Sequence, residues 1–213
     1  MKVLLVNGSP HKEGCTYTAL CEVSDILNLN GIDTDVFWIG DRPLPGCAAY
    51  QKCRDFNSCA FIDSVSDFLD LAGDYDGFIF GTPAQWAEAA GAMTCFLDRA
   101  FYADLNGGGR RFYLKPAAAV ISARRTGTAA AWVQMNQYFG LMQMPIITSR
   151  NWNMVHGATP EEVRQDSEGI QAMRMLGHNM AYFLKCKDVG SKLIPFPPRE
   201  DSEFIRSMQR NPG

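Results

Sequence analysis

Hydroxyl, thiol and imidazole side chains gather in one polar stretch near the N-terminus, GSPHKEGCTYT at residues 8–18. An apolar run, KVLLV at 2–6, precedes this stretch, and a helical pattern follows it. A helix that begins after a tight loop leaves backbone N–H groups unpaired and points the positive end of its dipole at the loop, which favours phosphate or carboxylate. The stretch therefore predicts an anion site, whose hydroxyl donors are Ser9, Thr16 and Thr18.

Two common phosphate-binding motifs do not match this loop. The P-loop pattern G-x-x-x-x-G-K-[ST] fails because no lysine follows Gly14, and the glycine spacing is not that of the dinucleotide fingerprint G-x-G-x-x-G. Gly8 and Gly14 still allow close approach of the backbone. The loop alone leaves a second interpretation open, in which it is a polar turn that caps a helix and binds no ligand.

The elements that position this loop are five apolar runs separated by helical patterns. The runs lie at 2–6, 35–39, 77–81, 117–122 and 145–149, and the helical patterns at 16–30, 63–72, 89–103 and 128–142. Apolar runs without strict alternation are typical of parallel strands buried on both faces, so we predict a doubly wound α/β sheet. A capped helix is expected from Thr159, with a restart near Asp166 and an end at about Lys185.

Three segments in this framework resemble one known family. GSPHKEGCTYTAL, GTPAQWAEAAGAMTCFLDR at 81–99 and SARRTGTAAA at 122–131 are similar to the phosphate loop and the two ring loops of the flavodoxin-like NAD(P)H-dependent FMN reductases. His11 and Cys15 depart from the basic residue and the asparagine of that family's first loop. The resemblance covers residues 1–186 and implies one flavodoxin-like domain with a five-stranded parallel sheet in the order 2-1-3-4-5 and helices on both faces. Residues 187–213, rich in proline and charge, are expected to form an extended C-terminal arm.

The resemblance further implies FMN as cofactor and NADPH or NADH as co-substrate. The predicted FMN-binding residues are Ser9, His11, Gly14, Cys15, Thr16, Tyr17, Thr18, Pro83, Ala84, Gln85, Trp86, Ala87, Arg124, Arg125, Thr126 and Gly127. Pro83 stiffens its turn, and the next four residues offer backbone donors and one aromatic plane, which suits a flat ring with a polar edge. Trp86 could instead be an ordinary core or interface aromatic.

The cations of the third loop have two possible roles at such a site. Arg124 or Arg125 would stabilise a reduced, anionic flavin, or would bind the phosphate of a nicotinamide cofactor. The simpler alternative is a pair of solvated arginines at a helix start. Hydride transfer to a flavin needs no dedicated catalytic side chain, so we expect none. His156 could donate a proton or cover the cavity. The alternative is an ordinary loop histidine whose side chain is bonded to the backbone.

Three of the seven cysteines, Cys47, Cys53 and Cys59, cluster in one segment. The iron–sulfur flavoproteins, a branch of the same family, carry a compact motif of four cysteines in this loop. The three cysteines match three of its positions and Tyr50 occupies the second. Because a cubane cluster normally needs four thiolates, we expect no metal here. A three-thiolate cluster, a zinc site and redox-active thiols remain as alternatives.

The composition and charge of the chain indicate which kinds of binding partner are not expected. The formal charge of −3 over 213 residues argues against a nucleic-acid or anionic membrane surface. No apolar run approaches the roughly 20 residues that span a bilayer. No signal peptide is evident, and an odd number of cysteines does not suggest a disulfide framework, so a cytoplasmic location is expected.

Together these features predict an FMN-dependent NAD(P)H oxidoreductase. Electrons would pass from a nicotinamide cofactor through bound FMN to a small acceptor such as a quinone, flavin, nitro or azo compound. The resemblance also implies a homodimer or homotetramer. One alternative is an FMN-holding electron-transfer protein fed by a protein donor, and another is a phosphate-binding module without flavin.

Overall fold

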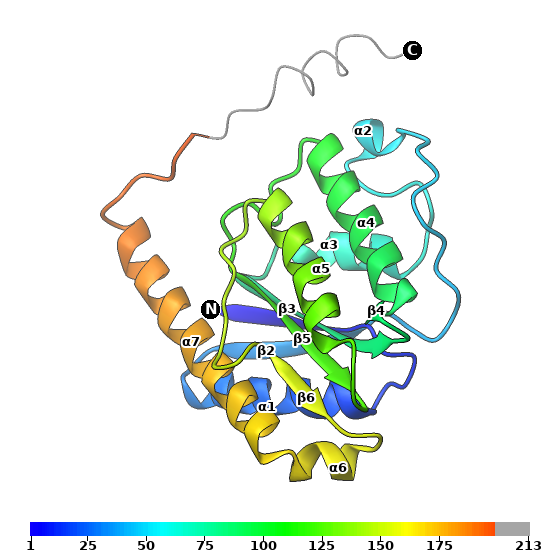
Figure 1. Cartoon of the computed structure of the whole chain (residues 1–213). Helices are drawn as coiled ribbons and strands as arrows, with labels where there is room; N and C mark the ends of the chain where they lie inside the picture. Colours follow the sequence, from blue (N-terminus) through cyan, green and yellow to red (C-terminus); the bar gives the residue numbers. More distant parts are fainter. Residues whose placement is uncertain (199–213) are drawn as a thin grey trace.

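A computed structural model describes residues 1–198 and shows a parallel sheet between two layers of helices (Figure 1). In chain order the elements are β1 Lys2–Asn7, α1 Cys15–Leu29, β2 Asp33–Trp38, α2 Cys53–Phe56, α3 Ser64–Ala72, β3 Gly77–Gln85, β4 Glu88–Ala89, α4 Gly91–Asn106, β5 Ala117–Ala123, α5 Thr128–Leu141, β6 Met154–His156, α6 Pro160–Gln165 and α7 Ser167–Ser191.

The parallel strands follow the order β2-β1-β3-β5-β6, and the short β4 pairs antiparallel with the end of β3. Counting parallel strands alone, this is the predicted order 2-1-3-4-5, and the doubly wound architecture is confirmed. The sixth strand, β4, was not predicted. Because parallel strands end at one edge, the segments that follow β1, β3 and β5 are brought together there.

The last parallel strand lies later in the chain than predicted. Residues 145–149 form only an isolated bridge, Ile146 to Ala117, and the strand that pairs with the end of β5 is β6. The buried side chain of Asn153 causes the displacement. It accepts a hydrogen bond from the Ser149 N–H (2.8 Å) and donates to the Ile147 carbonyl (3.3 Å), which holds residues 148–152 in an excursion away from the sheet.

The C-terminal helices confirm the predicted restart at Asp166, which separates α6 from α7. The predicted end near Lys185 is wrong, because α7 continues to Ser191, so the first residues assigned to the arm are helical. The division into a domain at 1–186 and an arm at 187–213 stays a prediction, and residues 199–213 of that arm lie outside the described residues.

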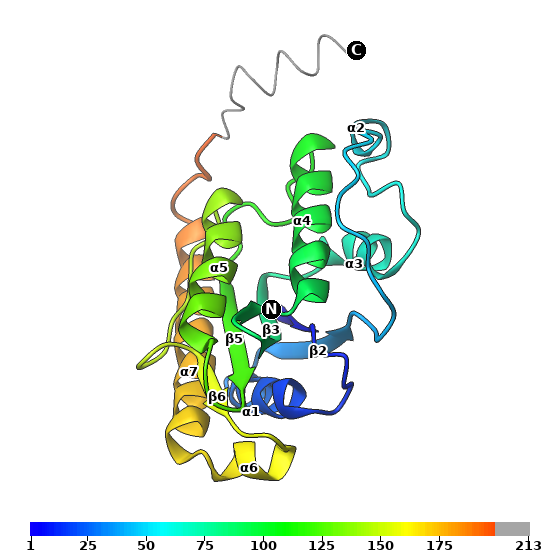
Figure 2. The ribbon, with the colours of Figure 1, turned by 45° about the vertical axis from the view of Figure 1, so that its right-hand side comes forward.

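The sheet separates two apolar layers. In β1, Leu4 and Val6 face the layer of α3, α4 and α5, whereas Val3 and Leu5 face α1, α6 and α7. Helices α1 and α7 lie side by side in the second layer, as both ribbon views show (Figures 1 and 2). Alternation along the strand and burial of both strand faces explain why the apolar runs lack strict periodicity.

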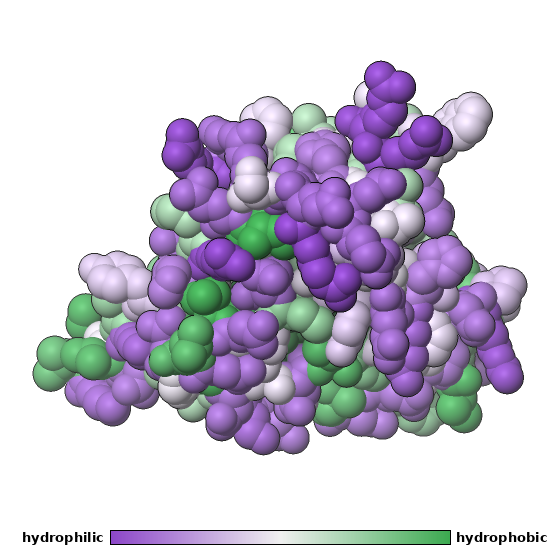
Figure 3. Space-filling view, turned by 90° about the horizontal axis from the view of Figure 1, so that it is seen from below, coloured by the Kyte–Doolittle hydropathy of each residue, from purple (hydrophilic) through white to green (hydrophobic). Residues whose placement is uncertain are grey.

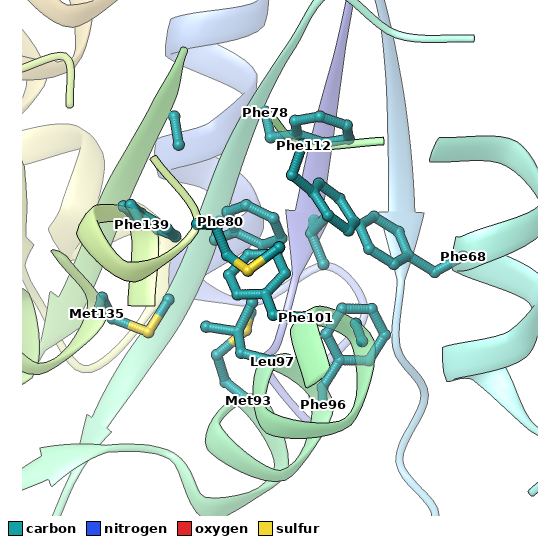
Figure 4. Packing of buried hydrophobic residues seen from close by; sticks show 14 of the residues in the cluster. Phe68, Phe78, Phe80, Met93, Phe96, Leu97, Phe101, Phe112, Met135 and Phe139 are labelled. Atoms are coloured by element: carbon teal, nitrogen blue, oxygen red, sulfur yellow. The ribbon is translucent and has the colours of Figure 1, made fainter. Parts of the chain in front are cut away.

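Aromatic rings dominate the first layer. Phe68 of α3 packs 5.0 Å from Phe96 of α4, and Phe101 of α4 packs 4.8 Å from Phe112, measured between ring centroids (Figure 4). These rings anchor α3 and α4 on β3, which fixes the helix that follows the β3–β4 hairpin. This close packing makes the sheet rigid beneath the edge where β1, β3 and β5 end.

No helix between residues 1 and 198 has both the length and the apolar character that crossing a membrane requires. Seen from below, the surface that carries α1 and α6 is mostly hydrophilic, and its apolar residues form small separate groups (Figure 3).

Candidate functional site

The first loop, residues 8–14, is organised by the residue before it. Asn7 accepts a hydrogen bond from the Ser9 N–H (3.0 Å) and donates to the Lys12 carbonyl (2.9 Å), and the Trp38 indole donates to the Ser9 carbonyl (2.8 Å). Sequence reasoning did not assign roles to Asn7 and Trp38. The available signal was position, because each ends a strand at the carboxyl edge, and an asparagine there commonly bonds the backbone two residues on.

Helix α1 begins directly after this loop without a side-chain cap. Its N-cap residue is Gly14, and its first turn contains no acidic residue. The first N–H groups of a helix have no acceptor within the helix, so those of α1 are open to an external acceptor. This is the geometry that the sequence predicted for an anion site.

The predicted hydroxyl donors are not equally free. The Thr18 hydroxyl donates to the Gly14 carbonyl (3.1 Å), and the Thr16 hydroxyl shares a hydrogen bond with that of Ser122 (2.8 Å). The Ser9 hydroxyl oxygen accepts from the His11 N–H (3.2 Å), and within the described residues no acceptor takes its proton. Ser9 is therefore the predicted hydroxyl best placed to donate to a bound anion.

The remaining first-loop residues divide by exposure. His11 lies exposed at the loop surface, whereas the Cys15 thiol is partly buried and donates to the Gly157 carbonyl (3.7 Å). Burial raises the pKa of the Cys15 thiol, so it behaves as a neutral packing group. Interaction with the Cys21 thiol, one helical turn on, raises the pKa of Tyr17.

The second predicted loop is largely a β-hairpin. The expected turn at Pro83 is wrong, because β3 continues to Gln85 and pairs Pro83 with Ser122 of β5. The turn lies at Trp86, whose φ of 65° and the Ala87 N–H to Gln85 carbonyl bond (2.9 Å) define a tight γ-turn. A bulky residue with positive φ is strained and is held only by its surroundings.

Trp86 is fully exposed, with a relative accessibility of 103%. The alternative of a core aromatic is therefore wrong. Its turn is clamped from α5, where the Gln134 side chain accepts from the Ala89 N–H (3.2 Å) and donates to the Glu88 carboxylate (3.0 Å). The hairpin thus displays an indole plane without packing it against the fold.

The third loop contacts this hairpin through Gly127. Its φ is +90°, and a Cβ at this position would lie 3.0 Å from the Ala87 carbonyl oxygen, so only glycine fits. Helix α5 follows at once and, like α1, has no side-chain cap. The two loops predicted to surround a ring are therefore in direct contact.

The first loop joins both of the others. The Gly8 N–H donates to the Gly81 carbonyl (2.8 Å) in β3, and the Thr16–Ser122 bond ties α1 to the end of β5. The three predicted loops therefore converge on one edge of the sheet, which we call the three-loop edge (residues 8–18, 82–87 and 122–128).

Free positive charge lies at this edge. Arg124, Arg125 and Thr126 are exposed, and among residues 1–198 neither arginine takes part in an ion pair. An unpaired surface cation keeps its full attraction for a charged ligand.

His156 lies in β6 and pairs with Ala123 at the end of β5, so its backbone adjoins the third loop of the three-loop edge. Its N–H donates to the Asp166 carboxylate (2.7 Å), and its ring Nδ1 lies 3.8 Å from the same oxygen. The ring lines a separate cavity of about 200 Å³ together with Arg150, Trp152 and Glu168. The geometry favours the structural interpretation of this histidine.

Cys47, Cys53 and Cys59 line a second cavity, of about 30 Å³, to which the start of α2 contributes Cys53. Burial raises the pKa of Cys53. Over the part of the chain that the structure describes, no group of three His, Cys, Asp or Glu side chains is arranged to hold a single metal ion.

The donor set at the three-loop edge fits FMN. The open N–H groups of α1 and the Ser9 hydroxyl suit a phosphate, the exposed indole of Trp86 suits a flat ring, and the free arginines suit negative charge. The match lies in the chemistry of the donors and in their convergence from three separate segments.

Comparisons with known proteins agree with a site for FMN. A family model described as NADPH-dependent FMN reductase matches residues 1–159. An iron–sulfur flavoprotein of Methanocaldococcus jannaschii is 26% identical over 191 residues, which cover 87% of this chain and 98% of that protein.

Solved structures show the same fold. RosB with a bound 8-demethyl-8-formylriboflavin-5'-phosphate intermediate superposes with a TM-score of 0.69 at 12% identity, covering 95% of this chain and 91% of that chain. A flavodoxin from the domain Archaea superposes with a TM-score of 0.58 at 15% identity, covering 87% of this chain and 99% of that chain. The fold is therefore flavodoxin-like.

Proposed function

The chain belongs to the NADPH-dependent FMN reductase family, and on this premise we propose that it binds FMN at the three-loop edge and reduces a small acceptor. Membership of this family confirms the resemblance seen in the sequence and the prediction that the chain is an FMN oxidoreductase. The acceptor classes proposed are quinones, free flavins, nitro compounds and azo compounds. The observation that carries the site assignment is the contact of three separate loops beside an uncapped helix start.

The proposed roles follow from the open donors. The N–H groups at the start of α1 and the Ser9 hydroxyl hold the phosphate, and the other first-loop residues shape the loop. The hairpin holds the ring through the plane of Trp86 and the backbone of Ala84, Gln85 and Ala87. Gly127 lets the third loop approach that hairpin, which brings Arg124 and Arg125 to the charged edge of the ring.

When bound, FMN supplies the redox chemistry, taking a hydride from the nicotinamide and delivering electrons to the acceptor. The chain's own work is to orient the ring and the two substrates. The strained turn at Trp86, clamped by Gln134, keeps the orientation fixed. No side chain is required to pass a proton along with the hydride. The His156 ring lies beside Asp166 and lines a cavity with Trp152 and Glu168.

Steady-state oxidation of NADPH and NADH by the FMN-loaded protein, with a quinone as acceptor, tests this proposal. We expect turnover with at least one nucleotide and no turnover before FMN is added. FMN binding without turnover would contradict the reductase assignment and favour an electron-transfer protein fed by a protein donor. Absence of FMN binding would contradict the site.

We also propose a homodimer or homotetramer, as the family resemblance implies. The exposure of Trp86 and the half-exposed Trp152, which stacks on Trp132 at 5.7 Å, supports a surface that a second copy would cover. Light scattering after size-exclusion chromatography would give the mass directly, and a monomer at micromolar concentration would contradict the proposal.

A cytoplasmic location is the last part of the proposal. All seven cysteines are free, which supports a reducing compartment. Fractionation of cells that produce the chain would test this, and recovery from a membrane or secreted fraction would contradict it.

A further inference from the structure

The cysteine pocket, lined by Cys47, Cys53 and Cys59, has the spacing of a cluster site with one ligand missing. Cys47, Tyr50 and Cys53 follow one another at intervals of three residues, and Cys59 lies further on. The run C-x2-C-x2-C with a later cysteine is a common [4Fe–4S] pattern, and here tyrosine stands at its second position. The relative from Methanocaldococcus jannaschii bears the name of an iron–sulfur flavoprotein.

The residues present do not fit a cubane cluster. Four thiolates normally hold one, and the pocket offers three. Tyr50 is 62% exposed, and its ring packs against Phe61 with 5.8 Å between centroids. Ala49 and Gln51 on either side have φ values of 54° and 59°, which turn the Tyr50 side chain outward from a strained backbone.

The inner wall of the cysteine pocket is formed by a buried cation, the guanidinium of Arg99. Arg99 of α4 is 1% exposed, and its Nε and Nη2 lie 3.3 Å and 3.2 Å from the Cys59 sulfur. The same guanidinium donates to both carboxylate oxygens of Asp63, at 2.7 Å and 3.0 Å.

Two more contacts close the loop around Arg99. Its Nη1 donates to the Pro45 carbonyl (3.5 Å), and the Phe61 ring lies 4.8 Å from the guanidinium carbon. A buried guanidinium needs acceptors on every side, and here the segment 45–63 supplies them. The segment is thereby tied to α4 through one side chain.

We propose that this pocket is a cluster site reduced to three thiols, in which Arg99 rather than iron closes the segment 45–61. Tyr50 then stands at the position where a fourth thiolate would complete the ligand set of a [4Fe–4S] cluster. The inference goes beyond the proposed function and concerns a different site. Only its consequence rests on that function, namely that electrons reach the acceptor from the three-loop edge without a second redox centre.

Anaerobic reconstitution with ferrous iron and sulfide tests the proposal on the full chain. After gel filtration, iron, acid-labile sulfide and zinc are measured per chain for the natural protein, Tyr50→Cys and the matched control Tyr50→Ser. We expect background metal in the natural protein and in Tyr50→Ser. Tyr50→Cys should gain about four irons and four sulfides.

Three results would overturn the proposal. A full cluster in the natural protein that Cys59→Ala removes would show that three thiols suffice. Stoichiometric zinc in the natural protein would show that the pocket holds metal in place of Arg99. Background iron in Tyr50→Cys, with an unchanged melting temperature and FMN affinity, would show that Tyr50 is not the deciding residue.

Hydrogen exchange of the natural chain provides a measurement that does not depend on any Tyr50 variant. In Arg99→Lys the cation remains beside Asp63 but the paired donors to the Cys59 sulfur are lost. We expect exchange at residues 45–61 to rise at least tenfold while β1 and β3 keep their protection. Unchanged exchange in 45–61 would contradict the role of Arg99.

Discussion

The helices of this chain begin in two ways. Helices α3, α6 and α7 start with a side chain that caps their N–H groups, from Asp63, Thr159 and Asp166 respectively. Helices α1, α2, α4 and α5 start without one, at Gly14, Lys52, Ala90 and Gly127. The first group caps its starts with its own side chains. In the second group, the starts of α1 and α5 leave their N–H groups open where the three loops meet.

Capped helix starts contribute to the stability of the fold, whereas uncapped starts, which we call open starts, keep N–H groups available to bind a ligand. A capped start contributes about 1 kcal/mol to folding, whereas an open start forgoes that contribution and retains donors for a ligand. Open starts at α1 and α5 lie on the three-loop edge, so the donors that the fold leaves unused are those that a phosphate and a ring edge would need. Mutations at the two kinds of start should therefore affect different quantities.

The largest expected effect is on a capped start. Asp63 caps α3 and also pairs with the buried Arg99, so Asp63→Ala leaves that cation without its carboxylate. We expect the free energy of unfolding to fall by about 3–5 kcal/mol, measured by urea denaturation. Asp63→Asn keeps a cap acceptor but not the charge, so it should lie between Asp63→Ala and the natural chain. Equal stability of all three would contradict the ion-pair account.

The next effect belongs to an open start. Gly14→Asp would place a carboxylate at the N-cap of α1, where it both occupies the open N–H groups and repels a phosphate. FMN affinity should fall by about 100-fold, or ~2.7 kcal/mol, measured by calorimetry.

Gly14→Ala is the matched control for that change. Any Cβ at position 14 would lie 2.9 Å from the His11 Cβ, so both variants carry the same steric cost. Alanine adds no charge, and its effect on FMN affinity should be within about fivefold. If alanine weakens FMN binding as much as aspartate does, the loss comes from packing and the open-start account fails.

Loss of the side-chain cap of α6 should have a smaller and different effect. Thr159→Ala removes the hydroxyl that accepts from the Glu162 N–H at 3.2 Å. We expect the unfolding free energy to fall by about 1 kcal/mol with FMN affinity unchanged. A change in FMN affinity larger than that of Gly14→Ala would break the separation between the two kinds of start.

The smallest expected effect concerns the free charges beside α5. The double change Arg124→Gln and Arg125→Gln should raise KM for NADPH by about two- to fivefold at low salt, because exposed charges contribute at most about 1 kcal/mol. The increase should shrink in 0.5 M salt, where screening dominates. A larger loss that salt does not reduce would place an arginine in direct, dry contact with a substrate.

Much of the fold was predictable from the sequence because buried strands appear in it as apolar runs. The apolar runs located β1, β2, β3 and β5, and Thr159-Pro160 located α6. The last strand was misplaced because a tertiary contact decides it. Asn153, one polar residue whose partners are set by the fold, moves the pairing from 145–149 to β6.

The candidate site was predictable as segments but not as geometry. Residue types indicated the three loops, and position along the chain indicated their shared edge. The hairpin at Trp86 and the internal use of the Thr16 and Thr18 hydroxyls depend on partners distant in sequence, such as Gln134 and Ser122. Such pairings leave no local pattern. Trp38 had only its position at the end of β2 to indicate its part, because its partner, the Ser9 carbonyl, is set by the fold.

The central claim is that the open start of α1 holds the phosphate of FMN. Calorimetric affinities of the natural chain for FMN and for riboflavin, which lacks only the phosphate, test it directly. We predict that FMN binds at least about 100-fold more tightly, and that Gly14→Asp removes most of this difference. Equal affinities for FMN and riboflavin in the natural chain would contradict the claim.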